Sequence, residues 1–291
     1  MTLSTLLTGS SGLLGYYISK ELYNMNYSVS NLCFLNKKSP DFISIDLRDK
    51  TKTFELLNSL NPSLIIHTAA LVNVDVCQND MQSAYLSNVK VTRNLVDWVN
   101  QKEKKVKLIY FSSDQVYSGD GPHNEIQVNP LNFYGMTKLW SEDIVSTCRE
   151  SLILRINFVG LGNSYHKGFA RWILKSLNEE KEFYGFEDIK FNPLHGSVLA
   201  KVLIDSLKEN LSGVFNIGSV GGISKADFII ELAKELNLSS AFIRKISYKS
   251  INSLTPRPYD MRMNIDNITN MLNFKFPNVE QSINLIAKEI E

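Results

Sequence analysis

The sequence predicts a doubly wound α/β fold in which helices cover both faces of a parallel sheet. Over the first 160 residues, short apolar runs alternate with longer helical patterns. These runs are almost continuously apolar, as expected of strands that are buried on both faces. A glycine-rich turn directly follows the first run. Together these features indicate a Rossmann-type domain at residues 1–158.

The elements of this domain follow from their apolar patterns. Short continuous apolar runs are expected to be strands, and apolar residues three and four positions apart are expected to mark helices. We predict strands at residues 3–8, 28–35, 42–46, 64–69, 106–112 and 152–158, and helices at residues 13–23, 53–60, 81–100 and 133–148.

The second half of the chain is less regular. Its patterns predict helices at residues 168–177, 197–207, 225–236 and 279–290, and a short strand at residues 214–217. We expect residues 213–219 to return to the main sheet. The rest of residues 159–291 is expected to form a smaller, discontinuous substrate-binding lobe. Such a lobe would lie at the carboxyl ends of the strands, where an open α/β sheet binds its ligand.

Composition excludes several classes of function. A formal net charge of +1 over 291 residues provides no electrostatic footprint for nucleic acid or an anionic membrane. No window approaches the roughly 18 apolar residues of a membrane span, and the N-terminus does not resemble a signal peptide. The three cysteines are scattered, and the four histidines lack the spacing of metal ligands. We therefore expect a cytoplasmic protein without a disulfide framework or a metal site.

The glycine-rich turn has the spacing GxxGxxG. Gly9 allows a tight turn, Gly12 lets the backbone approach a pyrophosphate, and Gly15 permits close packing of helix and strand. The following helix presents free N–H groups to the anion. A dinucleotide is therefore expected to contact the whole segment, which also includes Ser10, Ser11, Leu13 and Leu14.

The end of the second strand indicates which dinucleotide binds. Many NAD sites hold an acidic residue there, which bonds the ribose 2′-hydroxyl. Here the strand runs into Asn36, Lys37 and Lys38, and the two lysines favour the 2′-phosphate of NADPH, although NADH remains possible. The alternative is that both lysines are solvated loop residues. Asp46 and Leu47, at the end of the third strand, are placed to meet the adenine edge.

Three side chains predict chemistry at the carboxyl end of the sheet. Tyr134 and Lys138 share one face of a helix, and Ser113 follows the strand at residues 106–112. Reduction of a carbonyl needs a hydride and a proton, and Tyr134 would supply the proton. Its ordinary pKa is about 10, so it needs the nearby cation of Lys138. Ser113 would hydrogen-bond the carbonyl oxygen and orient it.

Several segments occur in the order found in one enzyme family. They are TGSSGLLG (8–15), DLRD (46–49), PSLIIHTAALVNVD (62–75), FSSDQVYSGDGPHNE (111–125), PLNFYGMTKLWSE (130–142), LRINFVGLG (154–162) and RPYDMR (257–262). The chain resembles the extended short-chain dehydrogenases/reductases, most closely the dTDP-4-dehydrorhamnose reductase family. The resemblance spans nearly the whole chain. It implies reduction of the C4 ketone of a nucleotide-linked 4-keto-6-deoxyhexose, a step in the synthesis of cell-surface polysaccharide sugars.

The resemblance also implies roles for further residues. Asn88 resembles the asparagine that braces the active site of the family, within reach of the cofactor. Substrate contacts are implied at Val74 and at Asp114 and Gln115, next to Ser113. The remaining cofactor contacts are implied at Ala69, Ala70, Leu71, Asn157 and Val159.

The chain departs from its neighbours at a few positions. Related sugar-nucleotide dehydratases carry Thr-Asp-Glu where this chain has Ser113-Asp114-Gln115, and Gln115 cannot exchange a proton near neutral pH. Related epimerase-reductases carry a cysteine at the position of Asp114, whereas Cys77 lies elsewhere and is expected to be buried. The reductases usually have Thr-Asp-Tyr at 113–115 and a tryptophan after a small residue at 157–158. These changes leave the particular sugar open.

Other polar residues have two interpretations each. His67 is expected to be a packed histidine within its strand. His123 and Glu125 are expected at the rim of the substrate site. His195 either faces the sugar or packs its loop. Arg257 either holds the substrate pyrophosphate or pairs with nearby Asp260.

Three functions therefore remain in view. The first is the reductase, acting on a nucleotide sugar. The second is a non-catalytic regulatory subunit that uses the same fold to bind a cofactor or a partner enzyme. The third is a sugar-nucleotide epimerase or dehydratase. A homodimer could form through the helices at residues 81–100 and 133–148.

Overall fold

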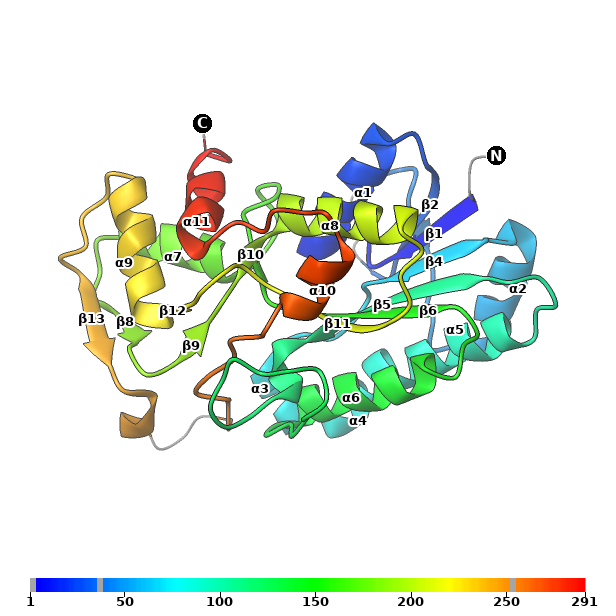
Figure 1. Cartoon of the computed structure of the whole chain (residues 1–291), viewed down its shortest axis with the longest axis horizontal. Coiled ribbons are helices and arrows are strands. Elements are labelled where there is room, and N and C mark those ends of the chain that lie inside the picture. The colour runs from blue at the N-terminus through cyan, green and yellow to red at the C-terminus, as the bar shows by residue number, and fades with distance from the viewer. Residues whose placement is uncertain (1–3, 36–38, 252–254, 291) are drawn as a thin grey trace.

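A parallel sheet of seven strands forms the centre of the molecule (Figure 1). The structure is a computed structural model, described here for residues 4–35, 39–251 and 255–290. The strand order is β11-β6-β5-β4-β1-β2-β3, so the direction of winding reverses between β1 and β4. The strands are β1 (Ser4–Thr8), β2 (Ser28–Cys33), β3 (Ile43–Ser44), β4 (Leu64–His67), β5 (Lys107–Ser113), β6 (Ser151–Ile156) and β11 (Gly213–Ile217). The predicted doubly wound fold and the return of residues 213–217 to the sheet are confirmed.

Successive residues of the strands point to opposite faces, and each face has its own apolar core. Leu6 and Ile65 belong to the core beneath the sheet in Figure 1, whereas Leu7 and Ile66 belong to the core above it. The upper face is covered by α1 (Leu13–Asn24), α8 (Gly196–Lys208) and α10 (Asp266–Met271). The lower face is covered by α2 (Lys50–Leu60), η1 (Tyr85–Lys90), α5 (Val91–Asn100) and α6 (Phe133–Val145). Helix α4 (Met81–Ala84) packs against α6 through Ala84.

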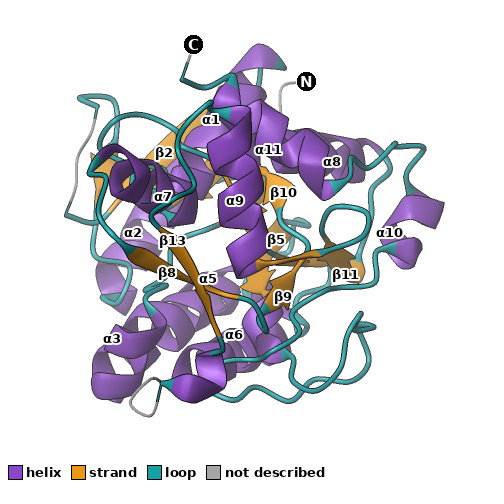
Figure 2. Cartoon of the chain, turned by 90° about the vertical axis from the view of Figure 1, so that its left-hand side faces the viewer, coloured by secondary structure: helices purple, strands orange, loops and turns teal. Residues whose placement is uncertain are grey.

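A smaller lobe lies at the carboxyl ends of the strands (Figures 1 and 2). Its apolar core draws on three α-helices and four strands, and Phe191 and Phe228 belong to it. Its elements are α7 (Phe169–Asn178), β8 (Phe183–Phe186), β9 (Lys190–Phe191), β12 (Ile223–Ser224), α9 (Lys225–Glu235), β13 (Ile243–Ile246), η3 (Tyr248–Ser250) and α11 (Val279–Ala287). The short pair β7 (Phe158–Val159) and β10 (Leu194–His195) connects the lobe to the sheet.

The predicted lobe boundary was wrong. Helix α8 and helix α10 were expected in the smaller lobe, but both contribute to the core above the sheet. Their apolar faces cover strand residues that α1 alone would leave exposed. The strand predicted at residues 42–46 was also too long, because the chain leaves the sheet after Ser44. The helix predicted at residues 81–100 contains a π-helical segment, η1, which carries Asn88.

Candidate active site

The glycine turn joins β1 to α1 and leaves the N-terminus of α1 open. Gly9 has a φ of +72°, and an added Cβ would lie 2.7 Å from the Ala69 nitrogen. A Cβ on Gly15 would lie 2.3 Å from the carbonyl oxygen of Gly9. Gly12 is the N-cap of α1, and no side chain hydrogen-bonds the cap. The turn therefore fits a dinucleotide, because free N–H groups and an uncovered backbone face the position of a pyrophosphate.

The other residues of the turn stabilise it from within. The Ser10 hydroxyl is buried and donates to the Leu7 carbonyl oxygen at 2.9 Å. Leu13 and Leu14 pack against the core above the sheet. Ser11 is half-buried. The backbone of this segment, more than its side chains, is available to a phosphate.

The segment after β4 forms the facing wall. The Thr68 hydroxyl donates to the Thr8 carbonyl oxygen at 2.7 Å, and the Ala69 nitrogen lies 3.3 Å from the Thr8 hydroxyl oxygen. Ala69, Ala70 and Leu71 are all half-buried. The predicted cofactor contacts of the first and fourth strands therefore lie side by side, where the winding of the sheet reverses.

Asn88 connects this wall to α6. Its Oδ1 accepts from the Leu71 nitrogen at 2.7 Å, and its Nδ2 donates to the Leu71 carbonyl oxygen at 3.1 Å. The same amide donates to the Thr137 hydroxyl at 2.9 Å. Asn88 is fully enclosed. Its role in this structure is to brace the wall against the helix that carries the predicted catalytic residues.

The glycine turn and the facing residues 69–71 form the expected dinucleotide-binding surface, here called the cradle. At its far end, Asp46 forms an ion pair with Arg48. Arg48 donates to both of its carboxylate oxygens, with a closest distance of 2.7 Å, and this lowers the pKa of Asp46. The guanidinium also lies 4.8 Å above the Phe34 ring, while Leu47 is buried beneath. The sequence analysis did not predict a role for Arg48 in this part of the site. The predicted contacts at residues 36–38 lie outside the described residues.

Ser113 and Tyr134 meet at the carboxyl end of β5. Helix α6 begins at Phe133, one residue after an Asn132 side chain that accepts from the Gly135 nitrogen at 2.9 Å. The Tyr134 and Ser113 side chains hydrogen-bond each other, and burial raises the pKa of Tyr134. The Ser113 hydroxyl also lies 3.0 Å from an Asp114 carboxylate oxygen. Two of the three predicted catalytic side chains are thus in direct contact.

Lys138 is buried one helical turn further on. Its ammonium donates to the Phe111 carbonyl oxygen at 2.6 Å and lies 4.2 Å from the centre of the Tyr110 ring. Burial lowers its pKa to about 7, and the charge of Glu142 opposes this. Burial is the largest influence on the pKa of both residues in this structure, and the effect of the Lys138 charge on Tyr134 stays a prediction.

The chain matches one protein family over residues 3–291. The description of that family is RmlD substrate-binding domain. The chain belongs to this family. The predicted resemblance is confirmed.

Relatives of several kinds are similar to this chain over most of its length. A probable low-salt glycan biosynthesis reductase, Agl14 of Haloferax volcanii, is 24% identical and covers 95% of each chain. Methionine adenosyltransferase 2 subunit beta of Xenopus laevis is 26% identical over 91% of this chain and 81% of its own. The crystal structure of a dTDP-4-dehydrorhamnose reductase from Bacillus anthracis, in complex with NADP, has a TM-score of 0.88 at 22% identity and covers 99% of this chain and all of that one. At that identity the structural likeness establishes the fold.

In this RmlD-family chain, two of the predicted substrate residues, Val74 and Asp114, lie near Tyr134. Val74 begins the short helix α3 (Val74–Asn79) and packs in one apolar cluster with Tyr134. Asp114 is buried, which raises its pKa, and it accepts a short hydrogen bond from Asn157. The Gln115 amide nitrogen lies 2.7 Å from the Met261 sulfur. Val159 pairs with the smaller lobe in β7 and is buried.

Arg257 has a different partner from the one that the sequence suggested. It pairs with Asp75 at 2.8 Å, and its Nε is buried with no hydrogen bond among the described residues. Asp260 pairs with Arg262 instead, at 2.5 Å. Of the two alternatives for Arg257, pairing with Asp260 is therefore wrong, because Asp75 and Arg262 are the partners of these two side chains. Binding of the substrate pyrophosphate by Arg257 stays a prediction.

Three residues expected near the sugar belong to the packing. His195 is 2% exposed, caps α8, and places its Nε2 3.4 Å from Glu289, so its contacts in this structure are those of a residue that packs its loop. His123 is buried and stacks on Tyr117. Glu125 accepts from the Asn216 main chain at 3.1 Å.

His67 and Cys77 are both enclosed. The two ring nitrogens of His67 lie 2.7 Å from the Thr8 hydroxyl and 3.1 Å from the Thr92 hydroxyl. Burial lowers the pKa of His67 to about 3, so the ring is neutral. Burial raises the pKa of the Cys77 thiol to about 11. The packed histidine and the buried cysteine match the predictions.

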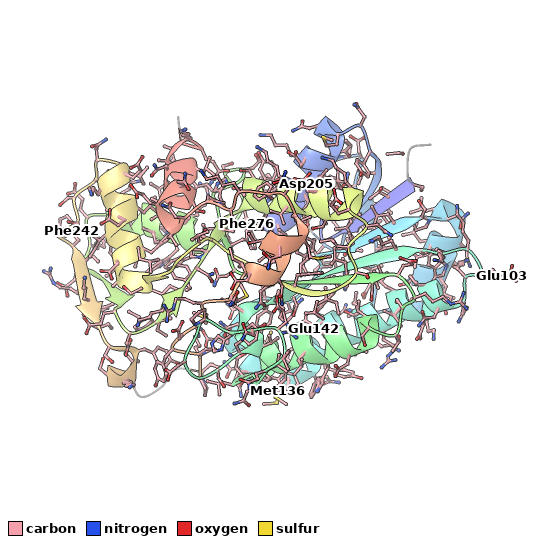
Figure 3. The ribbon with its side chains drawn as sticks, in the orientation of Figure 1. Glu103, Met136, Glu142, Asp205, Phe242 and Phe276 are labelled. Carbon is pink, nitrogen blue, oxygen red and sulfur yellow. The ribbon has the colours of Figure 1, made fainter. Side chains whose placement is uncertain are left out.

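A buried ion pair joins α6 to the sheet near the predicted catalytic residues. Glu142, on the sheet-facing side of α6 (Figure 3), accepts from Arg155 at 2.6 Å, and both side chains are about 5% exposed. Ser112 also donates to Glu142. Arg155 donates to the Tyr117 hydroxyl at 2.8 Å as well. The pair ties α6, β5 and β6 together.

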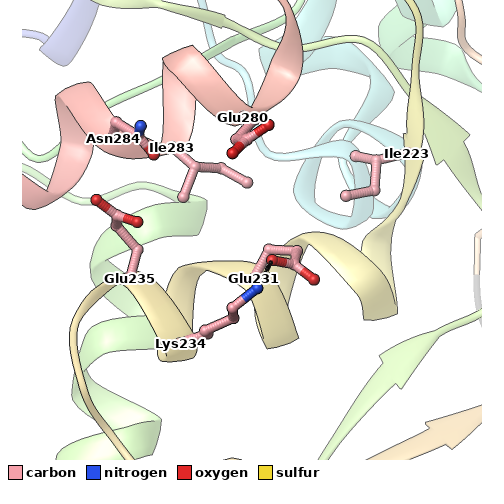
Figure 4. A pocket seen from close by; sticks show the side chains of 7 residues that line it. All are labelled: Ile223, Glu231, Lys234, Glu235, Glu280, Ile283 and Asn284. Atoms are coloured by element: carbon pink, nitrogen blue, oxygen red, sulfur yellow. Dashed lines mark hydrogen bonds and ion pairs between the residues drawn. The ribbon is translucent and has the colours of Figure 1, made fainter.

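A surface cavity of about 360 Å³ lies elsewhere, between α9 and α11 (Figure 4). Glu231, Glu235 and Glu280 line it, and it contains no predicted site residue. Nothing in it resembles the chemistry at Tyr134, and we do not assign it a role in the site. Across the described residues, no helix is long and apolar enough to cross a membrane, and no group of three or more His, Cys, Asp or Glu side chains could hold a metal ion.

Proposed function

We propose that this chain is an NADPH-dependent reductase of the C4 ketone of a nucleotide-linked 4-keto-6-deoxyhexose. The observation that carries the proposal is the position of the Tyr134–Ser113 contact, at the same edge of the sheet as the Gly9–Gly15 turn. A hydride donor bound on that turn and a proton donor at Tyr134 would meet over one ligand. Relatives named as a glycan biosynthesis reductase and as a dTDP-4-dehydrorhamnose reductase support this reading.

The chain's own residues supply the proton and the orientation. When bound, the nicotinamide supplies the hydride to the carbonyl carbon. Tyr134 donates its phenolic proton to the carbonyl oxygen, which becomes a hydroxyl. Ser113, already hydrogen-bonded to Tyr134, turns its hydroxyl toward the same oxygen and fixes it in place. Protonated Lys138, one turn along α6, supplies the positive charge that balances the tyrosinate left behind.

NADPH is the preferred cofactor in this proposal, with NADH as the weaker alternative. The neighbouring reductase from Bacillus anthracis was solved with NADP. In this chain, the guanidinium of Arg48 pairs with Asp46 beside Phe34, and its remaining N–H groups are available to a 2′-phosphate at this end of the cradle. Dehydration is disfavoured because Gln115 cannot act as an acid or a base.

The test replaces the proton donor. Tyr134→Phe removes one oxygen and keeps the ring that packs against Val74. With NADPH and a 4-keto-6-deoxyhexose nucleotide, we expect the rate of NADPH oxidation to fall about 100- to 10,000-fold. The matched control is Tyr85→Phe, at an exposed tyrosine of η1, which should oxidise NADPH at the wild-type rate. Full activity in Tyr134→Phe would rule out this mechanism.

A second function is favoured by one relative. The protein from Xenopus laevis is named as a subunit of methionine adenosyltransferase, so a non-catalytic subunit is the alternative proposal. It predicts that the wild-type chain binds NADPH and oxidises none of it with any 4-keto sugar nucleotide. An epimerase or a dehydratase would instead change the sugar without net consumption of NADPH.

A dimer and a cytoplasmic location are also part of the proposal. Four large apolar side chains are exposed on the lower helices: Met81, Tyr85, Met136 and Trp140. A second copy of the chain would cover them. The three cysteines are free thiols, which suits a reducing compartment. Sedimentation of wild-type protein and of Trp140→Asp would test the dimer.

A further inference from the structure

A lysine that the sequence analysis did not single out lies at the start of α9. Lys225 is the first residue of that helix, where a cation opposes the helix macrodipole. Its ammonium nitrogen lies 3.3 Å from the centre of the Phe191 ring and 4.5 Å from that of Phe169. In the described part of the chain, no carboxylate pairs with it and no hydrogen bond from it is found. A cation in this position is not explained by the stability of α9.

The strands of the smaller lobe bring Lys225 to the substrate side of the site. Helix α9 follows β12, which pairs with β9. The carbonyl oxygen of Lys190 in β9 accepts from the Met261 nitrogen at 2.8 Å. The Met261 sulfur in turn contacts the Gln115 side chain. A continuous series of contacts thus connects the element that carries Lys225 to Gln115, the residue that follows Asp114.

The charges of Lys225 and Asp114 act on each other. Burial lowers the pKa of Lys225 to about 7 and the Asp114 carboxylate opposes the change, while Arg257 adds to it. Burial raises the pKa of Asp114, and Lys225 opposes that change. The two groups are not in ion-pair contact. The Asp114 carboxylate accepts from Ser113 and Asn157, and the ammonium of half-buried Lys225 lies against aromatic rings, so neither charge has a direct partner of opposite sign. A polar ligand between them would hydrogen-bond both groups and so offset the free-energy cost of burying each charge.

We propose that Lys225 is a substrate-binding residue which, together with Asp114, holds two neighbouring hydroxyl groups of the hexose ring. The inference rests on the proposed function and deepens it. The Asp114 carboxylate accepts a hydrogen bond from one hydroxyl, and the Lys225 ammonium donates one to the oxygen of the other. A phosphate fits this place less well, because Asp114 would repel it. The pair selects a sugar ring that carries an intact diol.

The test measures binding without turnover. In the Tyr134→Phe chain, calorimetry compares Lys225→Met, Lys225→Arg and the exposed control Lys234→Met on the same helix. The probes are NADPH, a panel of dTDP-, CDP-, GDP- and UDP-linked 6-deoxyhexoses, and counterparts that lack the diol. We expect Lys225→Met to weaken binding of the best sugar nucleotide by about 10- to 100-fold. Lys225→Arg should recover part of the loss, and Lys234→Met should lose nothing.

Two comparisons exclude a purely structural role. NADPH affinity should be unchanged by Lys225→Met, and the loss should disappear with the counterparts that lack the diol. Equal losses for NADPH or for those counterparts would overturn the inference, as would no loss at all. If the wild-type chain oxidises NADPH with a keto sugar and Lys225→Met binds normally, only the inference fails. If no nucleotide sugar binds, the inference and the proposed function fail together.

Discussion

The buried pair of Glu142 and Arg155 provides a quantitative test of how this site is held together. We consider Glu142→Gln, which keeps the shape of the side chain and removes its charge. Arg155 would then keep its hydrogen bonds to the Tyr117 hydroxyl and the Glu125 carbonyl oxygen, at 2.8 and 2.6 Å, but would lose its counter-charge. Its side chain is 5% exposed, so water cannot replace the carboxylate.

The expected cost follows from this burial. Removing one partner of a buried ion pair typically costs about 3–5 kcal/mol, because the other charge is left without compensation. We therefore expect the free energy of unfolding of Glu142→Gln to fall by about that amount. The assay is urea denaturation followed by tryptophan fluorescence and by circular dichroism, which also shows whether unfolding is a single transition.

A surface pair on the neighbouring strand ends serves as the control. Lys105 and Glu150 lie 2.8 Å apart, but the lysine side chain is 73% exposed. Glu150→Gln should cost at most about 1 kcal/mol. In the double variant Glu142→Met/Arg155→Met neither position carries a buried charge, so part of the stability lost in Glu142→Gln should return. The reasoning is refuted if Glu142→Gln costs no more than Glu150→Gln.

Three further predictions concern the cradle, the lysine and the end of α11. Gly15→Ala would place a methyl group 2.3 Å from the Gly9 carbonyl oxygen, so we expect loss of measurable NADPH binding in a fluorescence titration while circular dichroism still shows a folded chain. Burial lowers the pKa of Lys138 to about 7, so its charge is lost as the pH rises through about 7. We therefore expect kcat/KM to fall above this pH, and a rate that stays constant to pH 9 would contradict the role of the cation. The same shift makes the Lys138 contribution to the unfolding free energy increase with pH between about 7 and its ordinary pKa, because the folded state binds fewer protons there than the unfolded state. Tyr17→Phe removes a bond of 2.5 Å to the Glu289 carboxylate and one of 3.0 Å from the Gly162 nitrogen, at an expected cost of about 1–3 kcal/mol in urea unfolding. An unchanged midpoint would show that these bonds contribute nothing.

The elements of the sheet could be predicted because their signals are local. A buried strand is an apolar run, and the turn after β1 needs glycine at Gly9 and Gly15 whatever the rest of the chain does. Helix α8 illustrates the limit. Its periodicity predicted a helix at residues 197–207, and one is found at Gly196–Lys208. Its place above the sheet depends on which apolar surface α1 leaves uncovered, and no local pattern encodes that.

In the candidate site too, some features could be predicted from the sequence and others depend on tertiary packing. Ser113 and Tyr134 could be placed together in advance, because the carboxyl ends of strands and the helices that follow them meet at one edge of a parallel sheet. The direction in which a long side chain points could not be predicted from the sequence. Lys138 turns to the Phe111 carbonyl oxygen, and Arg257 turns to Asp75. Several partners lie within reach of such a side chain, and packing selects among them.

By itself, the sequence determined the doubly wound sheet, the nucleotide cradle and the family to which the chain belongs. Each depends on residue types at short, fixed spacings, or on segments in a fixed order. The tertiary structure alone decided the partner of Arg257, the burial of His195 and the influence of the Asp114 charge on Lys225. These depend on contacts between residues far apart in the chain, where burial sets the strength of each charge. The cost of an unpaired charge can be read only once the surroundings of the side chain are known.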